Sequence, residues 1–255
     1  MKLSTKDLQT AVHQINTHGF VIFPSVLSRN FIAKLHAAFM KNFADYIART
    51  DPNRGANRYQ MHLPFMPPFI DPQVIENSLV LSIVDALLGD DCVCHYFASD
   101  TPLPGSDYQK VHSDIHALFP ETGIVPPAYS LVLNIPLVDF REDNGPLEIW
   151  PNTHTLGAHT DIEKLAAQKP SERVRMPAGS LLIRDMRMWH RGTPNASDNP
   201  RPNLALIFSR HWLKTQYPPI AIPAETYARL SKRAKKLFRL ENIGGDCAPA
   251  VADAH

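Results

Sequence analysis

A succession of short apolar segments, separated by turn residues, constrains the fold of this chain more than any other feature. The turns between them are rich in Pro, Gly and Asn, as in REDNGP and NASDNP, which suits antiparallel strands. The strand-like segments lie at 90–100, 129–140, 147–154, 181–190 and 201–212. This pattern predicts a mainly β protein whose core, at about 90–215, is a jelly roll, that is, a cupin-like double-stranded β-helix.

Helical patterns fall mainly outside this core. Ser4 or Thr5 can cap a first helix to about Thr17, and Ser28 can cap a second with a stripe of aromatic and aliphatic residues. Further helices are predicted near 76–88 and, with a basic face, at 224–240. We therefore expect one domain over 1–243, with N-terminal helices at 5–50, followed by a disordered tail at 244–255.

Composition excludes several classes of function. The formal net charge is +1 and charged residues are 20% of the 255 residues, so no global field favours nucleic acid or a membrane as partner. The three cysteines show no disulfide or zinc spacing, and the first residues lack a signal-peptide core. These features predict a cytoplasmic protein that acts on a small-molecule substrate.

The stretch QKVHSD, residues 109–114, holds the strongest candidate site. On an extended strand alternate side chains share a face, so His112 and Asp114 would point the same way. Together with His190 they could form a facial triad of two histidines and one carboxylate, which binds iron(II). A chance occurrence stays open at this point, because His159-Thr160-Asp161 has the same spacing in a context that favours a helix N-cap.

The segment 51–72 is predicted to be irregular because its prolines are dense. Long loops in compact domains are often functional, and this one mixes polar and aromatic side chains. We expect Arg58, His62 and Phe65 to line the substrate entrance. The alternative is a surface loop that its aromatic residues hold in place.

Several of these segments resemble the phytanoyl-CoA dioxygenase family of iron(II)- and 2-oxoglutarate-dependent oxygenases. The resemblance runs from about Gly19 to Trp212, through GFVIFPSVLS, QKVHSD, DNGPLEIWPNTH and GSLLIRDMRMWHRGTPN. Within the family, the chain most resembles members that tailor bacterial natural products.

Carried over to this chain, the resemblance implies that His112, Asp114 and His190 ligate iron. Arg201 would bind the distal carboxylate of 2-oxoglutarate, because a guanidinium pairs bidentately with a carboxylate. Gln109 would contact the same co-substrate. Where the family often has Ser or Thr, two residues after the second histidine, this chain has Gly192, so Thr193 is the replacement we expect.

The implied reaction uses oxygen to decarboxylate 2-oxoglutarate to succinate while an unactivated C–H group of a small metabolite is hydroxylated. Desaturation, epimerisation or ring closure by the same oxidant stays open, as does a non-catalytic cupin-type binding protein. Halogenation is disfavoured, because related halogenases have a small residue at the position of Asp114.

Overall fold

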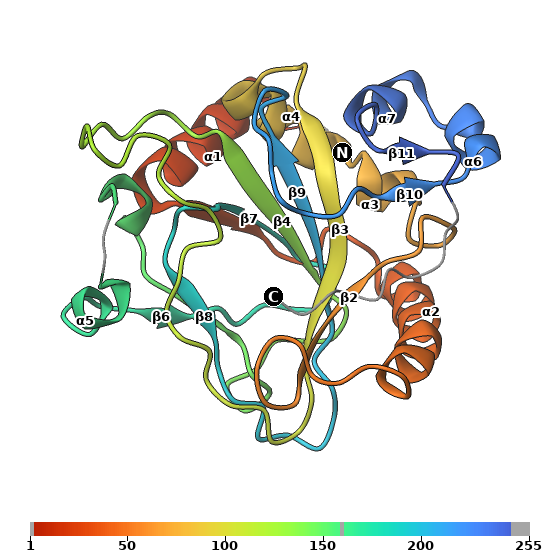
Figure 1. Ribbon diagram of the computed structural model, residues 1–255, viewed down its shortest axis with the longest axis horizontal. Helices are drawn as coiled ribbons and strands as arrows, with labels where there is room; N and C mark the ends of the chain where they lie inside the picture. The colour runs from red at the N-terminus through yellow and green to blue at the C-terminus, as the bar shows by residue number, and fades with distance from the viewer. Residues whose placement is uncertain (1–2, 159–160, 246–255) are drawn as a thin grey trace.

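The computed structural model describes residues 3–158 and 161–245, and within them the strands form two facing sheets. The large sheet has the order β1-β7-β4-β9-β3-β2 and the small sheet the order β6-β5-β8, with all neighbours antiparallel. This jelly-roll core confirms the predicted fold class (Figure 1). The strands of the two sheets are β1 (Phe20–Phe23), β2 (Arg58–His62), β3 (Val93–Pro102), β4 (Ser130–Pro136), β5 (Leu147–Ile149), β6 (Glu172–Arg173), β7 (Leu181–Asp185), β8 (His190–Gly192) and β9 (Asn203–Ser209).

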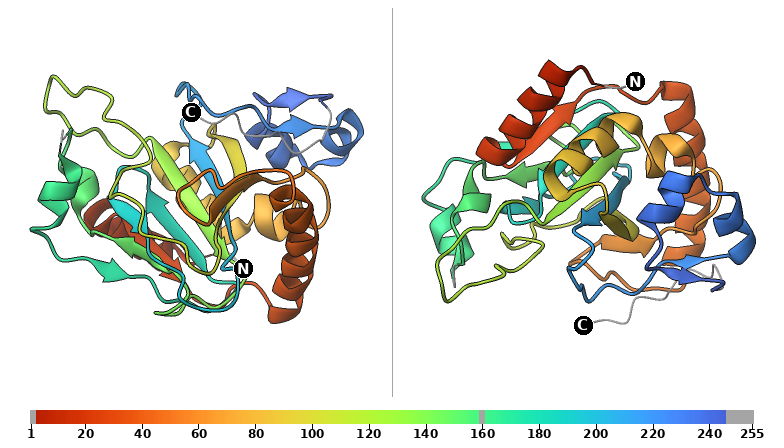
Figure 2. Two further views of the ribbon diagram at one scale, coloured as in Figure 1. Left: turned by 60° about the horizontal axis from the view of Figure 1, so that its bottom comes forward. Right: turned by 90° about the horizontal axis from the view of Figure 1, so that it is seen from above.

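Helices cover one side of the large sheet, with α1 and α4 on that side and β6 and β8 on the other (Figures 1 and 2). The helices are α1 (Thr5–His18), α2 (Arg29–Ile47), α3 (Pro72–Ile75), α4 (Ser78–Leu88), α5 (Ile162–Ala166), α6 (Ala224–Arg229) and α7 (Lys232–Leu237), with a 3₁₀ turn η1 (Thr153–Thr155). Ser4 and Ser28 cap α1 and α2 as expected, since their side chains accept hydrogen bonds from the first turns. No described helix has the length and apolar character needed to cross a bilayer.

The two faces of the large sheet have different surroundings because side chains alternate along each strand. On β7, Leu181 and Ile183 belong to the apolar core beneath the helices. Their neighbours Leu182 and Arg184 face a cavity between the two sheets. The fold therefore buries one face completely and leaves the inner face available for polar side chains.

Two segments differ from the sequence prediction. The region predicted to be irregular contains β2, which pairs with β3; its five residues, Arg58–His62, carry none of the local prolines. The strand predicted over 181–190 is interrupted, because the Asp185 side chain accepts a hydrogen bond from Arg187 N at 2.9 Å and stabilises a turn. His190 consequently opens β8 instead of ending a long strand.

The C-terminal helix predicted over 224–240 is two short helices, α6 and α7. Leu230 between them is extended, and Ser231 caps α7 by accepting from Ala234 N at 3.0 Å. The basic face is used within the chain: Lys236 Nζ lies 3.1 Å from Asp90 Oδ2 and Arg233 pairs with Asp85. The strands β10 (Ala221–Ile222) and β11 (Asn242–Ile243) close this unit. Residues 246–255, most of the tail predicted to be disordered, lie outside the described residues.

Candidate metal centre

His112, Asp114 and His190 come together between the sheets. One ligand atom from each lies within 4.8 Å of the other two, and this is the only such cluster of His, Cys, Asp and Glu found in the described residues. Asp114 Oδ1 lies 3.6 Å from His112 Nε2 and 3.4 Å from His190 Nε2. Two imidazoles and one carboxylate that converge in this way match the donor set of a facial iron(II) site.

The other ring nitrogens are already engaged. His112 Nδ1 lies 2.8 Å from the Lys110 carbonyl oxygen and His190 Nδ1 lies 3.1 Å from that of Met188. A carbonyl can only accept, so Nδ1 of His112 carries a proton and its Nε2 lone pair points toward the cluster. At His190 the Met188 carbonyl favours the same tautomer, because it is nearer to Nδ1 than Arg184 NH1, at 3.1 against 3.4 Å. Burial, together with the charge of Arg184, lowers the pKa of His190 to about 4, which keeps this ring neutral and able to ligate.

Arg184 supports the carboxylate from the large sheet. Its NH2 lies 2.6 Å from Asp114 Oδ2, the oxygen that faces away from both histidines. Burial alone would raise the pKa of Asp114, but Arg184 and then His190 overcome this and hold it well below its ordinary value. Asp114 is therefore ionised, with one oxygen held by Arg184 and the other free for a cation.

Local backbone pairing, and not a regular strand, positions the His-x-Asp pair. His112 and His190 exchange two backbone hydrogen bonds of 3.0 and 2.9 Å as an isolated bridge, and Asp114 N donates to Met186 O at 2.9 Å. The strand predicted here is thus reduced to one bridge, although the alternation of side chains is kept. The other His-x-Asp sequence, residues 159–161, has the helix cap that its context favoured. Asp161 caps α5 by accepting from Lys164 N at 3.0 Å, and His159 lies outside the described residues.

Arg201 lies in the wall of the same cavity, which we call the metal cavity. Its guanidinium sits 4.3 Å above the Phe140 ring, and its NH2 lies 3.3 Å from Asp100 Oδ2. Burial lowers the pKa of Arg201 to about 10, so the group is still protonated at neutral pH. The residue is 1% exposed, yet its Nε has no hydrogen-bond partner within the described part of the chain.

Two asparagines of the metal cavity share this property. The side-chain oxygens of Asn134 and Asn203 are buried without a partner among the described residues, and both side chains line the cavity next to Arg201. The Nε of Arg184, which also lines the cavity, is likewise unpartnered among the described residues. Buried polar groups in proteins are nearly always hydrogen-bonded, so four unpartnered groups around one cavity indicate a polar ligand. The Arg201 Nε–H can donate to a carboxylate such as that of 2-oxoglutarate, whereas the two asparagine oxygens are acceptors and need a donor.

Gln109 lines the cavity but uses its amide on the backbone. Oε1 accepts from Gly192 N at 2.9 Å, and Nε2 donates to Arg54 O at 3.3 Å. The Thr193 hydroxyl donates to Pro146 O at 2.7 Å and is buried away from the cavity, so the co-substrate role expected for Thr193 does not fit. Position 192 has room only for glycine, because a Cβ there would lie 2.5 Å from the Arg58 guanidinium carbon.

The three residues expected at the substrate entrance are not together there. Phe65 is in the core, with its ring centroid 4.9 Å from that of Phe238. Arg58 is fully buried, where NH1 lies 3.3 Å from Asp100 Oδ2 and NH2 donates to Thr193 O at 2.9 Å. His62 packs edge-on against Tyr96, behind the wall of the metal cavity. β2 fixes Arg58 and His62 against β3, whereas Phe65 lies three residues beyond its end.

Sequence reasoning gave no role to several residues that line the metal cavity, namely Tyr96, Asp100, Arg184 and Tyr217. Arg54 and Gln60, which also line it, belong to the polar and aromatic mixture of segment 51–72 that was expected to suit a ligand. For Arg184 a signal was available, because a charged residue inside an apolar strand needs a partner. Tyr217 follows the last large strand, and no local pattern places it near residues 96 or 114.

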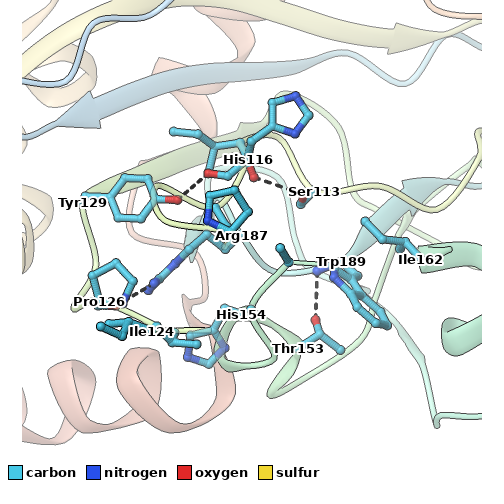
Figure 3. Close-up of a pocket in the computed structure, with 16 residues that line it drawn as sticks. Ser113, His116, Ile124, Pro126, Tyr129, Thr153, His154, Ile162, Arg187 and Trp189 are labelled. Carbon is cyan, nitrogen blue, oxygen red and sulfur yellow. Dashed lines mark hydrogen bonds between the residues drawn. The ribbon is translucent and has the colours of Figure 1, made fainter. Parts of the chain in front are cut away.

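A second pocket lies on the opposite side of residues 112–115 (Figure 3). Ser113, Ile115 and His116 line it, whereas His112 and Asp114 line the metal cavity. Its remaining wall includes Tyr129, whose hydroxyl donates to His116 O at 2.6 Å, and Arg187, which donates to Pro126 O at 2.7 Å. Alternate side chains of residues 112–115 thus line two different cavities, one on each side of the segment.

Comparison with known proteins agrees with this geometry. Residues 15–203 match the family model of phytanoyl-CoA dioxygenase (PhyH). Among solved structures, EctD from S. alaskensis with 2-oxoglutarate and 5-hydroxyectoine has a TM-score of 0.63 at 18% identity, over 81% of this chain and 76% of that one. SnoK, a non-haem α-ketoglutarate-dependent carbocyclase from nogalamycin biosynthesis, has a TM-score of 0.62 at 19% identity, over 81% and 84%.

A third similar structure, EvdMO1, has a TM-score of 0.65 at 21% identity and covers 80% of this chain, which spans 50% of EvdMO1. At these identities the structural likeness establishes the fold. The family model, by contrast, spans most of the sequence, from before β1 to the start of β9, and includes all members of the cluster. The chain belongs to the phytanoyl-CoA dioxygenase family of iron(II)- and 2-oxoglutarate-dependent oxygenases.

Proposed function

We propose that this protein hydroxylates an unactivated C–H group of a small-molecule metabolite, with release of succinate and carbon dioxide. The observation that carries the proposal is the meeting, in one cavity, of the His112–Asp114–His190 cluster and the incompletely paired guanidinium of Arg201. One half of this arrangement suits a ferrous ion, and the other suits the distal carboxylate of 2-oxoglutarate.

Each residue then has a defined task. His112, Asp114 and His190 hold iron, and Arg184 keeps Asp114 ionised and oriented. Arg201 anchors 2-oxoglutarate, and bound iron with 2-oxoglutarate and oxygen supplies the oxidising power. Gln109 acts mainly through the backbone, because it ties β8 to the segment that carries Arg54.

The position of Arg201 favours it over two other arginines. Arg191 pairs with Glu148, with Nε 2.6 Å from Oε2, and its guanidinium lies over the Tyr108 ring outside the metal cavity. Arg210 donates to Leu87 O and Ala128 O at the far end of β9. Neither is free to meet a carboxylate beside the cluster.

Other outcomes of the same oxidant form the second candidate. The carbocyclase SnoK has a similar fold, so ring closure, like desaturation or epimerisation, is an alternative to hydroxylation. Asp114 argues against halogenation, since its carboxylate occupies the position where a halide would need room. A non-catalytic cupin-type protein would have no need for the Arg184–Asp114 pair beside Arg201.

Succinate formation tests the proposal. Purified protein with ferrous iron, 2-oxoglutarate and oxygen should produce succinate, and a small-molecule metabolite extract should stimulate this and yield a product 16 mass units heavier than its substrate, as expected for one inserted oxygen atom. A product two mass units lighter would indicate desaturation or ring closure instead. Iron-independent or absent succinate formation under all of these conditions would favour the binding protein.

A further inference from the structure

Arg54 is a cationic side chain of the metal cavity that has no carboxylate partner. It lines the cavity together with His112, Asp114 and Asp100. Asp114 pairs with Arg184, and Asp100 pairs with Arg58 and Arg201, each within 3.3 Å. No ion pair within 4.0 Å joins Arg54 to an acidic group of the described residues. Asp100 and Asp114 act on Arg54 electrostatically without direct pairing, so its guanidinium remains available to pair directly with a ligand.

Two glutamines fix Arg54 at the cavity. Gln60 Oε1 accepts a hydrogen bond from Arg54 Nε, and Gln109 Nε2 donates to Arg54 O at 3.3 Å. Arg54 N also donates to Arg58 O at 3.2 Å, which joins it to β2. Arg54 is exposed where it lines the cavity. An ordinary exposed arginine is mobile and solvated, whereas both the backbone and the guanidinium of Arg54 are held by hydrogen bonds. A preorganised cation of this kind loses little entropy when it binds an anion.

The net charge of the metal cavity with iron and 2-oxoglutarate bound also favours an anionic ligand. The protein contributes two more positive than negative charges here. The cations are Arg54, Arg58, Arg184 and Arg201, and the anions are Asp100 and Asp114. A ferrous ion adds two charges and the 2-oxoglutarate dianion removes two, so the loaded cavity keeps a net charge of about plus two with neutral imidazoles. Such a site attracts an anionic molecule and repels a cationic one.

An apolar wall lies next to Arg54. The rings of Tyr96 and Tyr217 pack with centroids 4.8 Å apart, and both side chains line the cavity together with Arg54. Val132, Ala205 and Ile207 continue this wall on β4 and β9. A ligand with an anionic end at Arg54 could therefore place an apolar body along the wall, close to the His112–Asp114–His190 cluster.

We propose that the substrate is a small amphipathic carboxylate and that Arg54 binds its carboxylate group. This inference rests on the proposed function and adds the chemical class of the substrate. Arg54 thereby becomes a specificity-determining residue, distinct from Arg201, which serves the co-substrate.

The test uses the protein loaded with ferrous iron and 2-oxoglutarate, with oxygen excluded. Calorimetry first measures the binding of iron and 2-oxoglutarate, and then that of four probes, acetate, propanoate, benzoate and 3-phenylpropanoate, each beside its amide. We expect at least one carboxylate to bind about tenfold more tightly than its amide, since a charge-assisted hydrogen bond is lost in the amide. Arg54→Gln should remove this preference, and Arg54→Lys should keep part of it.

Arg49→Gln is the matched control, because Arg49 is an exposed arginine five positions earlier, outside the cavity, and should keep the full preference. The inference is wrong if no carboxylate binds the wild type more tightly than its amide, or if Arg54→Gln retains the preference. It is also wrong if Arg54→Gln weakens 2-oxoglutarate binding as much as loss of Arg201 does. Failure of the wild type to bind iron or 2-oxoglutarate would instead overturn the proposed function itself.

Discussion

The metal cavity and the second pocket flank the same four residues, 112–115, but they differ in how fully the protein satisfies its own arginines. In the second pocket all three guanidinium nitrogens of Arg187 are engaged, with Nε and NH2 on Asp185 at 2.9 and 2.7 Å and NH1 on Pro126 O at 2.7 Å. In the metal cavity, Arg201 has one contact at 3.3 Å to a shared Asp100 and an unpartnered Nε.

This difference indicates where a ligand belongs. The second pocket is the larger, about 280 Å³ against about 100 Å³, so volume alone would select it. In the second pocket, however, the hydrogen bonds around Arg187 are complete, and His154 Nδ1 is its one unpartnered buried side-chain atom among the described residues. The metal cavity has four such atoms, on Asn134, Arg184, Arg201 and Asn203. Unsatisfied polar groups are costly, and their persistence at one place marks a site that a bound group completes.

The largest effect is expected from breaking the cluster. His112→Ala or Asp114→Ala should abolish iron binding and succinate formation, because each removes one of three ligands. Ser113→Ala, between them in sequence but facing the second pocket, is the matched control and should bind iron like the wild type. Equilibrium dialysis with ferrous iron measures this.

Circular dichroism of the iron-free wild type provides a further check on this prediction. The protein should stay folded without metal, because its core does not depend on the cluster. An unfolded iron-free protein would show that the metal is structural, and Ser113→Ala with the same loss as Asp114→Ala would end the distinction between the two faces.

The next largest effect concerns the two ends of β9. Arg201→Ala should raise the apparent KM for 2-oxoglutarate about thirtyfold or more, since loss of a buried charge pair costs about 2–5 kcal/mol. Arg201→Lys should recover only part, because an ammonium lacks the planar fork. Arg210→Ala should leave this KM unchanged, as Arg210 contacts backbone carbonyls away from the cavity. The reverse result for Arg201 and Arg210 would contradict the assignment.

A smaller effect, on the unfolding free energy, is expected from placing a side chain at Gly192. In Gly192→Ala the new methyl group collides with the Arg58 guanidinium, and overpacking of this kind costs about 1–3 kcal/mol of unfolding free energy. In an Arg58→Ala background the same substitution should cost much less. Chemical denaturation of the four proteins of this cycle measures the coupling, and equal costs in both backgrounds would show that Arg58 does not set the requirement for glycine.

The smallest effect is expected in the second pocket. Tyr129→Phe removes the hydroxyl that donates to His116 O, so unfolding free energy should fall by about 1 kcal/mol. Iron and 2-oxoglutarate affinity should stay at the wild-type level, since Tyr129 does not line the metal cavity. A marked loss of either affinity would mean that the two cavities are coupled through residues 112–115.

Part of the fold and of the metal site could be predicted, because the sequence patterns that encode it span only a few neighbouring residues. Caps and periodicity predicted α1 and α2, and turn residues between short apolar segments predicted the jelly roll. The alternation of His112 and Asp114 also needed only two neighbouring residues, and it holds although the predicted strand is a single bridge. The interruption after Asp185 was missed, since a side chain accepting from a nearby backbone N–H competes with strand pairing in a way that apolar patterns do not reveal.

The sequence by itself predicted the fold class, because alternation and turn chemistry are properties of short segments. Together with the family resemblance it also predicted the three members of the cluster. Only the tertiary structure decided which charges meet. It placed Arg184 on Asp114 across 70 positions, moved Phe65 into the core and brought Arg54 into the cavity without a carboxylate partner among the described residues. The physical reason is that ion pairing and burial depend on how segments distant in sequence pack together. For Arg184 on β7, a register shift of one residue would turn the side chain to the opposite face of the sheet.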